Sequence, residues 1–341
     1  MKALVTGGGG YLGSRIARML RTRGDDVVIL GRSTYPQHDE AGIRTIRADL
    51  RDATAIEKAC QGIDAVFHVG ALVGIWGRRK TYWDINVNGT KNVLNGCRVH
   101  GVRQLVYTSS ASVVFDKDAL CGVDESQPYA TRYLADYPET KAVAERMILA
   151  ANGPTLATVA LRPHLIWGPG DPHLIPRVIE RARHGRLVQV GDGENLVDIT
   201  YVDNAAEAHL RAAEALAAAA SCAGRAYFLS QGEPVPLWPW LNEILAAVGI
   251  PKVTQTVSYH RAYCVGAMLE GVHRLVPTVR EPRMTRFLAV QLAKSHYFDI
   301  SASRRDLGYH PRTSTAEGVH FLLKSLGASC GRNFSSASGL E

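Results

Sequence analysis

The chain lacks the segments that would place it in a membrane or send it across one. Among its 341 residues, no run approaches the roughly 18 consecutive uncharged apolar residues of a membrane span. Glycines begin at Gly7, so no apolar signal segment follows the first residues. These absences predict a cytoplasmic protein with no integral membrane segment.

Cysteine pairs, metal-binding spacings and a basic stripe are missing as well. The six cysteines form no C-x-x-C motif and the twelve histidines no H-x-x-x-H motif, so we expect reduced thiols, most of them buried, and no bound metal. The net charge is +7, but the basic residues are dispersed and the densest group is only Arg78–Lys80. We therefore expect no nucleic-acid binding, and at most a preference for small anionic ligands.

What the chain does contain is an alternation of short apolar runs with segments of helical spacing. Strands are predicted at residues 2–6, 27–30, 45–46, 65–69, 105–107, 157–161 and 226–229. Helices are predicted at residues 11–23, 53–60, 82–99 and 138–151, and further along at 238–248 and 288–294. This order indicates an α/β fold, a doubly wound parallel sheet with helices on both faces.

The sequence TGGGGYLG lies between the first predicted strand and the first predicted helix. There, Gly7 allows a tight turn, Gly10 allows the backbone to approach a pyrophosphate, and Gly13 allows the helix to lie close to the sheet. Free N–H groups at the start of the helix, at Tyr11 and Leu12, would face the phosphates. The segment predicts a Rossmann-type dinucleotide-binding domain.

The regular alternation weakens after Pro163, where proline and glycine become frequent. We therefore expect the dinucleotide-binding domain at residues 1–162, with returning segments near 195–230, and a smaller, mainly substrate-binding region at 163–325. The tail at 326–341 is rich in small and polar residues and is expected to be disordered.

Together with later motifs, the glycine loop resembles the extended short-chain dehydrogenase/reductases. The resemblance covers residues 1 to about 310, with the motifs in the family's order: HVGAL (68–72), NVNGT (86–90), YTSSASVVF (107–115), YPETK (137–141), LRPHLIWGPGD (161–171) and YVDNAAEAH (201–209). Gly70 departs from the family's H-x-A-A pattern, but it replaces one small residue by another.

The resemblance implies hydride transfer between a nicotinamide cofactor and a carbonyl carbon, with Ser110, Tyr137 and Lys141 as catalytic residues. Of the tyrosines at 129, 133 and 137, only Tyr137 has a lysine four residues later, which places both side chains on one helical face. A phenol with a pKa near 10 is a weak proton donor unless its anion is stabilised. We expect Lys141 to lower the pKa of Tyr137 and to hold the nicotinamide ribose. Ser110 matches the family's carbonyl-binding hydroxyl, and we expect Ser109 to be a neighbour of the cofactor or a structural residue.

The same resemblance assigns further residues to the cofactor. Asp49 and Leu50 follow the third predicted strand, where the family binds adenine, and the segment after the fourth strand passes a ribose. The remaining predicted cofactor contacts are Val69, Gly70, Ala71, Thr108, Pro163 and Leu165, besides Tyr137 and Lys141 themselves.

The end of the second predicted strand, VVILGRS, bears on the choice of cofactor. A carboxylate at this place binds the ribose hydroxyls of NAD and repels a 2′-phosphate. This chain has Gly31 there, followed by Arg32 and Ser33. A guanidinium and a hydroxyl suit a phosphate, so we expect NADP(H). NAD(H), with Arg32 as an ordinary solvated residue, is the alternative.

Within the family, VGIWG, YTSSASVVF and the late segment 281–309 are most similar to the 3β-hydroxysteroid dehydrogenase/isomerase branch, which includes 2-alkyl-3-oxoalkanoate reductases. The segments expected to cap the site carry Leu72, Val73, Ile75, Trp76, Trp83, Leu165, Ile166 and Trp167. Apolar walls suit a small hydrophobic substrate, either a sterol or an oxo acid, whose secondary alcohol and ketone would be interconverted. A sugar-nucleotide epimerase or dehydratase, and a dinucleotide-binding sensor or scaffold, are the alternatives.

Family resemblance also implies a homodimer through the predicted helices 82–99 and 138–151. The alternative is that the apolar residues of these helices pack only against their own sheet.

Overall fold

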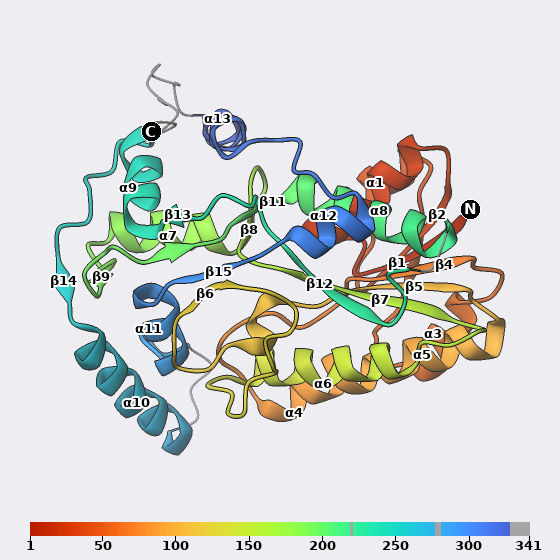
Figure 1. Ribbon diagram of the computed structural model, residues 1–341, viewed down its shortest axis with the longest axis horizontal. Coiled ribbons are helices and arrows are strands. Elements are labelled where there is room, and N and C mark those ends of the chain that lie inside the picture. The colour runs from red at the N-terminus through yellow and green to blue at the C-terminus, as the bar shows by residue number, and fades with distance from the viewer. Residues whose placement is uncertain (219–220, 277–280, 328–341) are drawn as a thin grey trace.

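Seven parallel strands form the central sheet, in the order β12-β7-β5-β4-β1-β2-β3 (Figure 1). The computed structural model describes residues 1–218, 221–276 and 281–327 of the chain. The strands are β1 (Lys2–Thr6), β2 (Asp26–Gly31), β3 (Arg44–Arg47), β4 (Ala65–His68), β5 (Gln104–Thr108), β7 (Ala157–Pro163) and β12 (Arg225–Leu229). The strand order reverses beside β1, and such a reversal opens a crevice for ligands at the carboxyl ends of the strands.

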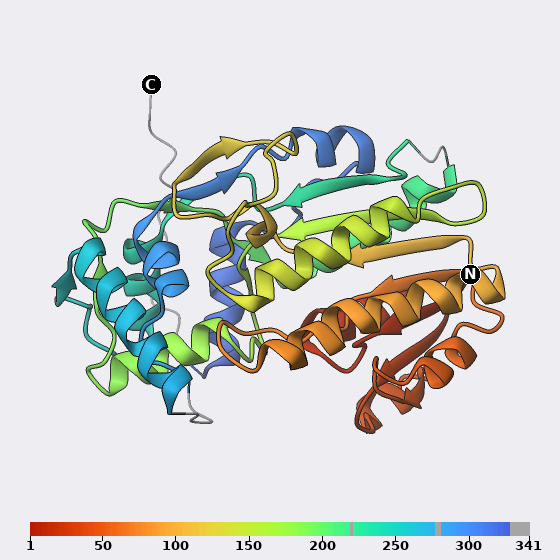
Figure 2. The ribbon, with the colours of Figure 1, turned by 90° about the horizontal axis from the view of Figure 1, so that it is seen from below.

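Helices cover both faces of the sheet because buried side chains alternate along each strand. Val5 points toward α1 (Tyr11–Thr22) and α8 (Val202–Ala218), and Leu4 points to the opposite face. That face is covered by α3 (Ala53–Ala59), α5 (Gly89–His100) and α6 (Asp136–Ala150), and Figure 2 shows α5 and α6 side by side across it. The predicted Rossmann-type α/β fold is confirmed.

Some local structure differs from the prediction. The helix predicted at 82–99 is continuous in space, but it consists of α4 (Arg79–Tyr82), a π-helical segment (Trp83–Asn88) and α5. Tyr82, Val93 and Cys97 of this helix are buried within their own chain, which is the alternative to a dimer contact. The five cysteines in the described ranges are free, and the buried Cys60 and Cys97 belong to the same hydrophobic cluster.

The smaller region is built from short strands and helices that pack around Trp167, Trp238 and Trp240. Its four-stranded sheet has the order β13 (Val235–Pro236), β10 (Leu196–Val197), β15 (His296–Phe298) and β6 (Leu120–Val123). The remaining elements of the chain are α2 (Pro36–Asp39), a 3-10 helix (Ala111–Val114), β8 (Ile166–Trp167), α7 (Leu174–Arg183), β9 (Gln189–Val190), β11 (Thr200–Tyr201), α9 (Leu237–Ala247), β14 (Thr256–Val257), α10 (Tyr259–Leu275), α11 (Arg286–Ala293), α12 (Ser301–Leu307) and α13 (Thr315–Ser325).

Segments cross between the two regions. β6, from the first region, pairs with β15 of the second, and β12 returns to the edge of the central sheet. The predicted domain boundary near residue 162 therefore stays a prediction. The predicted cytoplasmic location also stays a prediction. Among the described residues, no helix has the length and apolar character required to cross a membrane. Most of the tail predicted to be disordered lies outside the described residues.

A buried ion pair joins β7 to α6. Arg162 Nη2 lies 2.6 Å from Glu145 Oε1, and the exposed fractions of the two side chains are only 4% and 0%. The Tyr129 hydroxyl donates to the same carboxylate oxygen at 2.6 Å. Both charges are largely shielded from water, so each depends on the other.

Replacing Glu145 by Leu is expected to destabilise the fold by about 3–5 kcal/mol, because the Arg162 guanidinium would remain buried without a counter-charge. The measurement is urea unfolding followed by circular dichroism. The double variant Glu145→Leu/Arg162→Met should recover most of the loss, and Lys80→Ala, which breaks an exposed ion pair with Asp84, is the control. A double variant as unstable as the single would contradict this account.

Candidate active site

The glycine loop forms a close-packed cradle at the start of α1. Gly7 has a φ of +67°, and a β-carbon on Gly13 would lie 2.3 Å from the Gly7 carbonyl oxygen. Gly10 caps the helix without any side-chain hydrogen bond, and the first turn contains no acidic residue. The free N–H groups and the positive end of the helix dipole are thus available to an anion. This arrangement fits the pyrophosphate of a dinucleotide.

Two predicted loop residues offer only their backbone to such a ligand. Leu12 belongs to the hydrophobic core. The Tyr11 ring turns away from the loop toward Gly168, and burial raises the pKa of its hydroxyl well above the usual range.

A chain of buried hydrogen bonds connects three of the sequence motifs. The Gly70 N–H donates to Thr6 Oγ1 (3.1 Å), and the Thr6 hydroxyl lies 2.7 Å from His68 Nδ1. On the other side of the ring, His68 Nε2 lies 3.0 Å from Thr90 Oγ1, and the Thr90 hydroxyl donates to the Asn86 carbonyl at 2.6 Å. Because Thr90 uses its proton on that carbonyl, His68 donates from Nε2 and accepts at Nδ1. Burial lowers the pKa of His68 to about 3, so the ring is neutral.

The Asn86 side chain extends this chain to α6. Its carbonyl accepts from the Leu72 N–H (2.7 Å), and its amide donates to the Leu72 carbonyl and to Thr140 Oγ1, both at 3.1 Å. Thr140 stands on α6 between Tyr137 and Lys141. Sequence reasoning identified NVNGT as a motif but did not assign this bridging role to Asn86. The bulge of the π-helical segment is a feature often found at functional sites.

Tyr137 and Ser110 meet at the carboxyl end of β5. Ser110 is the side chain that acts on the Tyr137 hydroxyl, and Ser110 Oγ lies 2.8 Å from Ser112 Oγ. Burial raises the pKa of Tyr137 to about 12, and the Ser110 side chain lowers it in part. The phenol is therefore protonated at neutral pH and can act as a proton donor.

Lys141 lies one turn further along α6 and is almost fully buried. Its Nζ donates to the Thr108 carbonyl at 2.5 Å and lies 4.2 Å from the centre of the Tyr107 ring. Burial lowers the pKa of Lys141 from 10.5 to about 7, and the Glu145 carboxylate partly opposes this shift. The expectation that Lys141 lowers the pKa of Tyr137 is not met in this structure, because the ammonium is directed at β5 instead.

The competing hydroxyls have other partners or none. Tyr129 is bonded to Glu145, and the Tyr133 hydroxyl donates to the Val113 carbonyl at 3.0 Å. Thr108 Oγ1 lies 2.7 Å from Nε2 of His209, so its side chain is engaged. Ser109 Oγ is buried, and it has no hydrogen-bonding partner among the described residues. Of the three tyrosines in the described structure, Tyr137 alone has a pKa that Ser110 affects.

At the predicted adenosine end, positive charge predominates. Both oxygens of the Asp49 carboxylate accept from Arg51, at 2.9 and 2.8 Å, and this hydrogen bonding lowers the pKa of Asp49 to about 2. Arg32 and Ser33 are exposed, and neither side chain forms a hydrogen bond or ion pair within the described part of the chain. Leu50 is buried beside Gly70. Gly70 belongs to the segment Val69–Ala71, which follows β4.

The residues after β7 are packed more tightly than an open substrate wall would be. Trp167 is fully buried against Tyr201 and Trp240, so its prediction as a pocket residue is wrong. His164, which follows Pro163, is buried with Nε2 at 2.7 Å from His296 Nδ1. Leu165 has a φ of +40°, a strained value for a residue with a β-carbon.

The loop after β4 presents apolar side chains to the surface near α6. Val73 is 52% exposed, and the Trp76 ring packs edge-on against His273 of α10 at 6.1 Å between ring centres. Arg79 lies over the Trp83 ring and forms ion pairs with two acidic residues of α6. This loop is therefore the best-placed apolar surface for a substrate.

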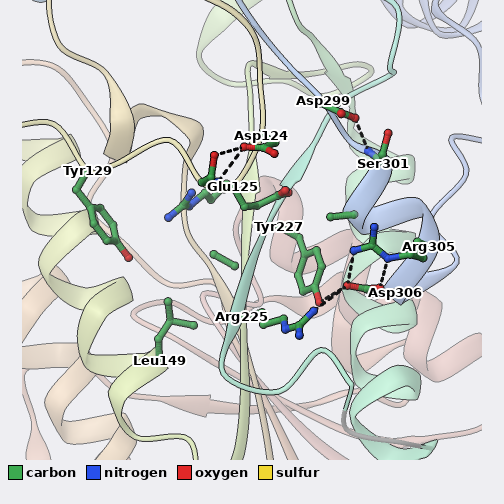
Figure 3. A pocket seen from close by; sticks show the side chains of 14 residues that line it. Asp124, Glu125, Tyr129, Leu149, Arg225, Tyr227, Asp299, Ser301, Arg305 and Asp306 are labelled. Atoms are coloured by element: carbon green, nitrogen blue, oxygen red, sulfur yellow. Dashed lines mark hydrogen bonds and ion pairs between the residues drawn. The ribbon is translucent and has the colours of Figure 1, made fainter.

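A charged cavity of about 560 Å³ lies elsewhere, along the outer edge of β12 (Figure 3). Arg225, Tyr227 and Arg305 surround Asp306 on one side of it, and Glu125 accepts from the Phe228 N–H at 2.8 Å on another. No predicted catalytic or cofactor residue lines it. Its charged lining does not suit a hydrophobic substrate.

Comparison with known proteins gives a consistent result. The model of the 3-beta hydroxysteroid dehydrogenase/isomerase family matches residues 4–258. The chain belongs to this family. It is 51% identical over 332 residues to a 2-alkyl-3-oxoalkanoate reductase of Stenotrophomonas maltophilia (strain K279a), covering 96% of this chain and 100% of the relative. It is also 33% identical to the decarboxylating sterol-4-alpha-carboxylate 3-dehydrogenase of Mus musculus, over 95% of this chain and 90% of the relative.

A solved structure supports the same assignment. MoeE5 in complex with UDP-glucose and NAD is 26% identical and superimposes with a TM-score of 0.75, covering 96% of this chain and 99% of that chain. The family member described here is thus an oxidoreductase of the extended short-chain dehydrogenase/reductase type that uses a nicotinamide dinucleotide.

Replacing Lys141 by Met should stabilise this enzyme most at low pH. The pKa of Lys141 is lower in the folded chain, so the cost of burying its charge is present below about pH 7 and disappears as the pH rises toward 10.5. The difference in melting temperature, variant minus wild type, should therefore fall between about pH 6 and pH 10. Thermal unfolding in that range measures it, with the exposed Lys117→Met as control. A difference that does not change with pH would contradict the assigned shift.

Proposed function

We propose that the chain is an NADP(H)-dependent oxidoreductase that interconverts a 2-alkyl-3-oxoalkanoate and the corresponding 2-alkyl-3-hydroxyalkanoate. The observation that carries the proposal is the interaction of the Tyr137 hydroxyl with the Ser110 side chain at the carboxyl end of β5. The pair lies in a chain that aligns over its length with a relative named for that reduction.

The catalytic residues proposed are Ser110, Tyr137 and Lys141. The bound nicotinamide supplies or accepts the hydride. The Ser110 hydroxyl binds the substrate carbonyl oxygen, and Ser112 keeps it in position through the 2.8 Å contact. Tyr137, protonated at neutral pH, donates its proton to that oxygen as negative charge develops there. Lys141 binds the nicotinamide ribose from α6.

The preference for NADP(H) is inferred from the charges near β2. Gly31 leaves no carboxylate at the strand end, while Arg32 and Ser33 are exposed and unpaired among the described residues. The nearest acid on β3's side, Asp49, is already neutralised by Arg51. A phosphate would therefore meet a guanidinium and no free carboxylate.

The substrate class is inferred from the loop after β4. This loop carries the exposed Val73 and half-buried apolar side chains, and Asn86 ties it to Thr140, one turn from Tyr137. A carboxylate could pair with Arg78, since Arg79 and Arg177 already form ion pairs with acidic residues of the chain. An apolar wall with one cation suits an alkylated oxo acid.

Replacing Tyr137 by Phe should reduce turnover by roughly 10²–10⁴-fold, because the proton donor is lost. Binding of the dinucleotide, followed by nicotinamide fluorescence, should remain close to that of the wild type. Tyr133→Phe is the matched control and should retain activity, since that hydroxyl is bonded to the Val113 carbonyl. Activity that survives in Tyr137→Phe would remove Tyr137 from the mechanism.

The substrate class and the cofactor are tested together by nicotinamide absorbance. The purified protein is offered 2-alkyl-3-hydroxy acids, hydroxysteroids and UDP-sugars, each with NADP⁺ and with NAD⁺. Turnover of the hydroxy acids with NADP⁺ is expected. Turnover with NAD⁺ alone would reject the role of Arg32, and turnover of a UDP-sugar alone would reject the substrate class.

We also propose that the enzyme is a homodimer that uses the outer surfaces of α5 and α6, which lie side by side on one face (Figure 2). Light scattering at micromolar concentration is expected to give twice the chain mass, and an Arg substitution at the half-exposed Met147 should shift it toward the monomer. A monomer in the wild type would contradict the dimer.

A further inference from the structure

Tyr35 lies beside the glycine loop, in a position that sequence analysis did not single out. A β-carbon added to Gly9 would lie 2.0 Å from ring atoms Cε1 and Cζ of Tyr35. A β-carbon added to Gly31 would lie 2.6 Å from its hydroxyl oxygen. A side chain at either glycine would therefore collide with the Tyr35 ring, which extends from the glycine loop to the end of β2.

The ring is held in place by the short helix α2. Tyr35 precedes Pro36, which disfavours a helical backbone at the residue before it, and Tyr35 has a φ of −135° and a ψ of 77°. His38 packs edge-on against the ring, at 6.2 Å between ring centres. The buried His38 is in turn anchored to α1, with Nε2 at 3.1 Å from Ser14 Oγ. Tyr35 therefore occupies a built position and does not simply fill a loop.

That position is where dinucleotide-binding folds distinguish their cofactors. An acidic side chain at the end of the second strand binds the 2′-hydroxyl of NAD, and an arginine accommodates the 2′-phosphate of NADP. Here Gly31 has no side chain, and the Tyr35 hydroxyl fills the space beside it. This hydroxyl has no hydrogen-bonding partner among the described residues, and the ring is half-buried.

We propose that Tyr35 is the specificity-determining residue for the cofactor, and that its hydroxyl donates a hydrogen bond to the 2′-phosphate of NADP(H) beside Arg32. A neutral phenol donates to a phosphate without repelling it, whereas a carboxylate in this space would repel it. Arg32 supplies the charge and Tyr35 the shape of the site. The inference rests on the NADP(H) preference in the proposed function.

The test measures the binding of NADPH and NADH by nicotinamide fluorescence, without substrate. Tyr35→Phe keeps the ring and is expected to weaken NADPH binding roughly tenfold while leaving NADH binding unchanged. Tyr297→Phe, on the distant strand β15, is the control and should change neither affinity. An equal loss for both dinucleotides, or no loss, would overturn the proposal, because the ring would then only pack the loop.

A second pair of variants tests whether the group that fills the space beside Gly31 sets the cofactor preference. Gly31→Asp alone should weaken both dinucleotides, because its side chain collides with the Tyr35 hydroxyl. Gly31→Asp/Tyr35→Ala should bind NADH more tightly than NADPH, since the carboxylate now has room. A double variant that still prefers NADPH would overturn the proposal. A wild-type protein that binds neither dinucleotide would instead reject the proposed function itself. If the wild type turns over with NADPH and Tyr35→Phe keeps the wild-type preference for NADPH over NADH, only the role of Tyr35 is rejected.

Discussion

The buried His68 ring is the constraint on which the rest of the site depends. It is neutral, and both of its nitrogens are committed, one to Thr6 at the start of the glycine loop and one to Thr90. Through these bonds the loop, the segment after β4 and the π-helical bulge keep a fixed arrangement. A protonated ring would donate from Nδ1 as well, so the Thr6 hydroxyl could no longer donate to it and would need another acceptor. The cradle for the dinucleotide and the helix that carries Tyr137 are therefore parts of one hydrogen-bonded unit.

Burial of the Lys141 charge in this unit has a cost in stability. An ammonium group in a nearly dry position is unfavourable, and the Thr108 carbonyl, the Tyr107 ring and the Glu145 carboxylate compensate only partly for its lost hydration. A neutral side chain of similar length would pack there at lower cost. The lysine is understandable only if its charge is used, and a nicotinamide ribose placed between it and Tyr137 would give it that use. Local strain at Leu165 belongs to the same end of the sheet.

The fold and the residues proposed for catalysis were accessible from the sequence because their signals are local. Alternating apolar runs specified the seven central strands, and the i, i+4 spacing singled out Tyr137 and Lys141. Contacts between distant segments were not accessible. Nothing in the sequence pairs Asn86 with Thr140, Tyr35 with Gly9, or His164 with His296, and two-residue strands such as β8 and β9 have no periodicity to detect. Trp167 was misplaced because an aromatic residue after a strand fits a pocket wall as well as a core, and only three-dimensional packing separates the two.

The outer edge of the central sheet has a further consequence. β12 is the edge strand of the seven-stranded sheet. The Phe228 N–H of this strand donates a hydrogen bond to the Glu125 carboxylate and not to another strand. A side chain thus blocks the position that an unrelated chain would use to extend the sheet. This protection depends on the segment around Glu125 remaining folded against the edge. Local unfolding of that segment would expose the edge of β12 to pairing with a strand of another molecule. Resistance to aggregation would then depend on a segment that is remote from the candidate active site.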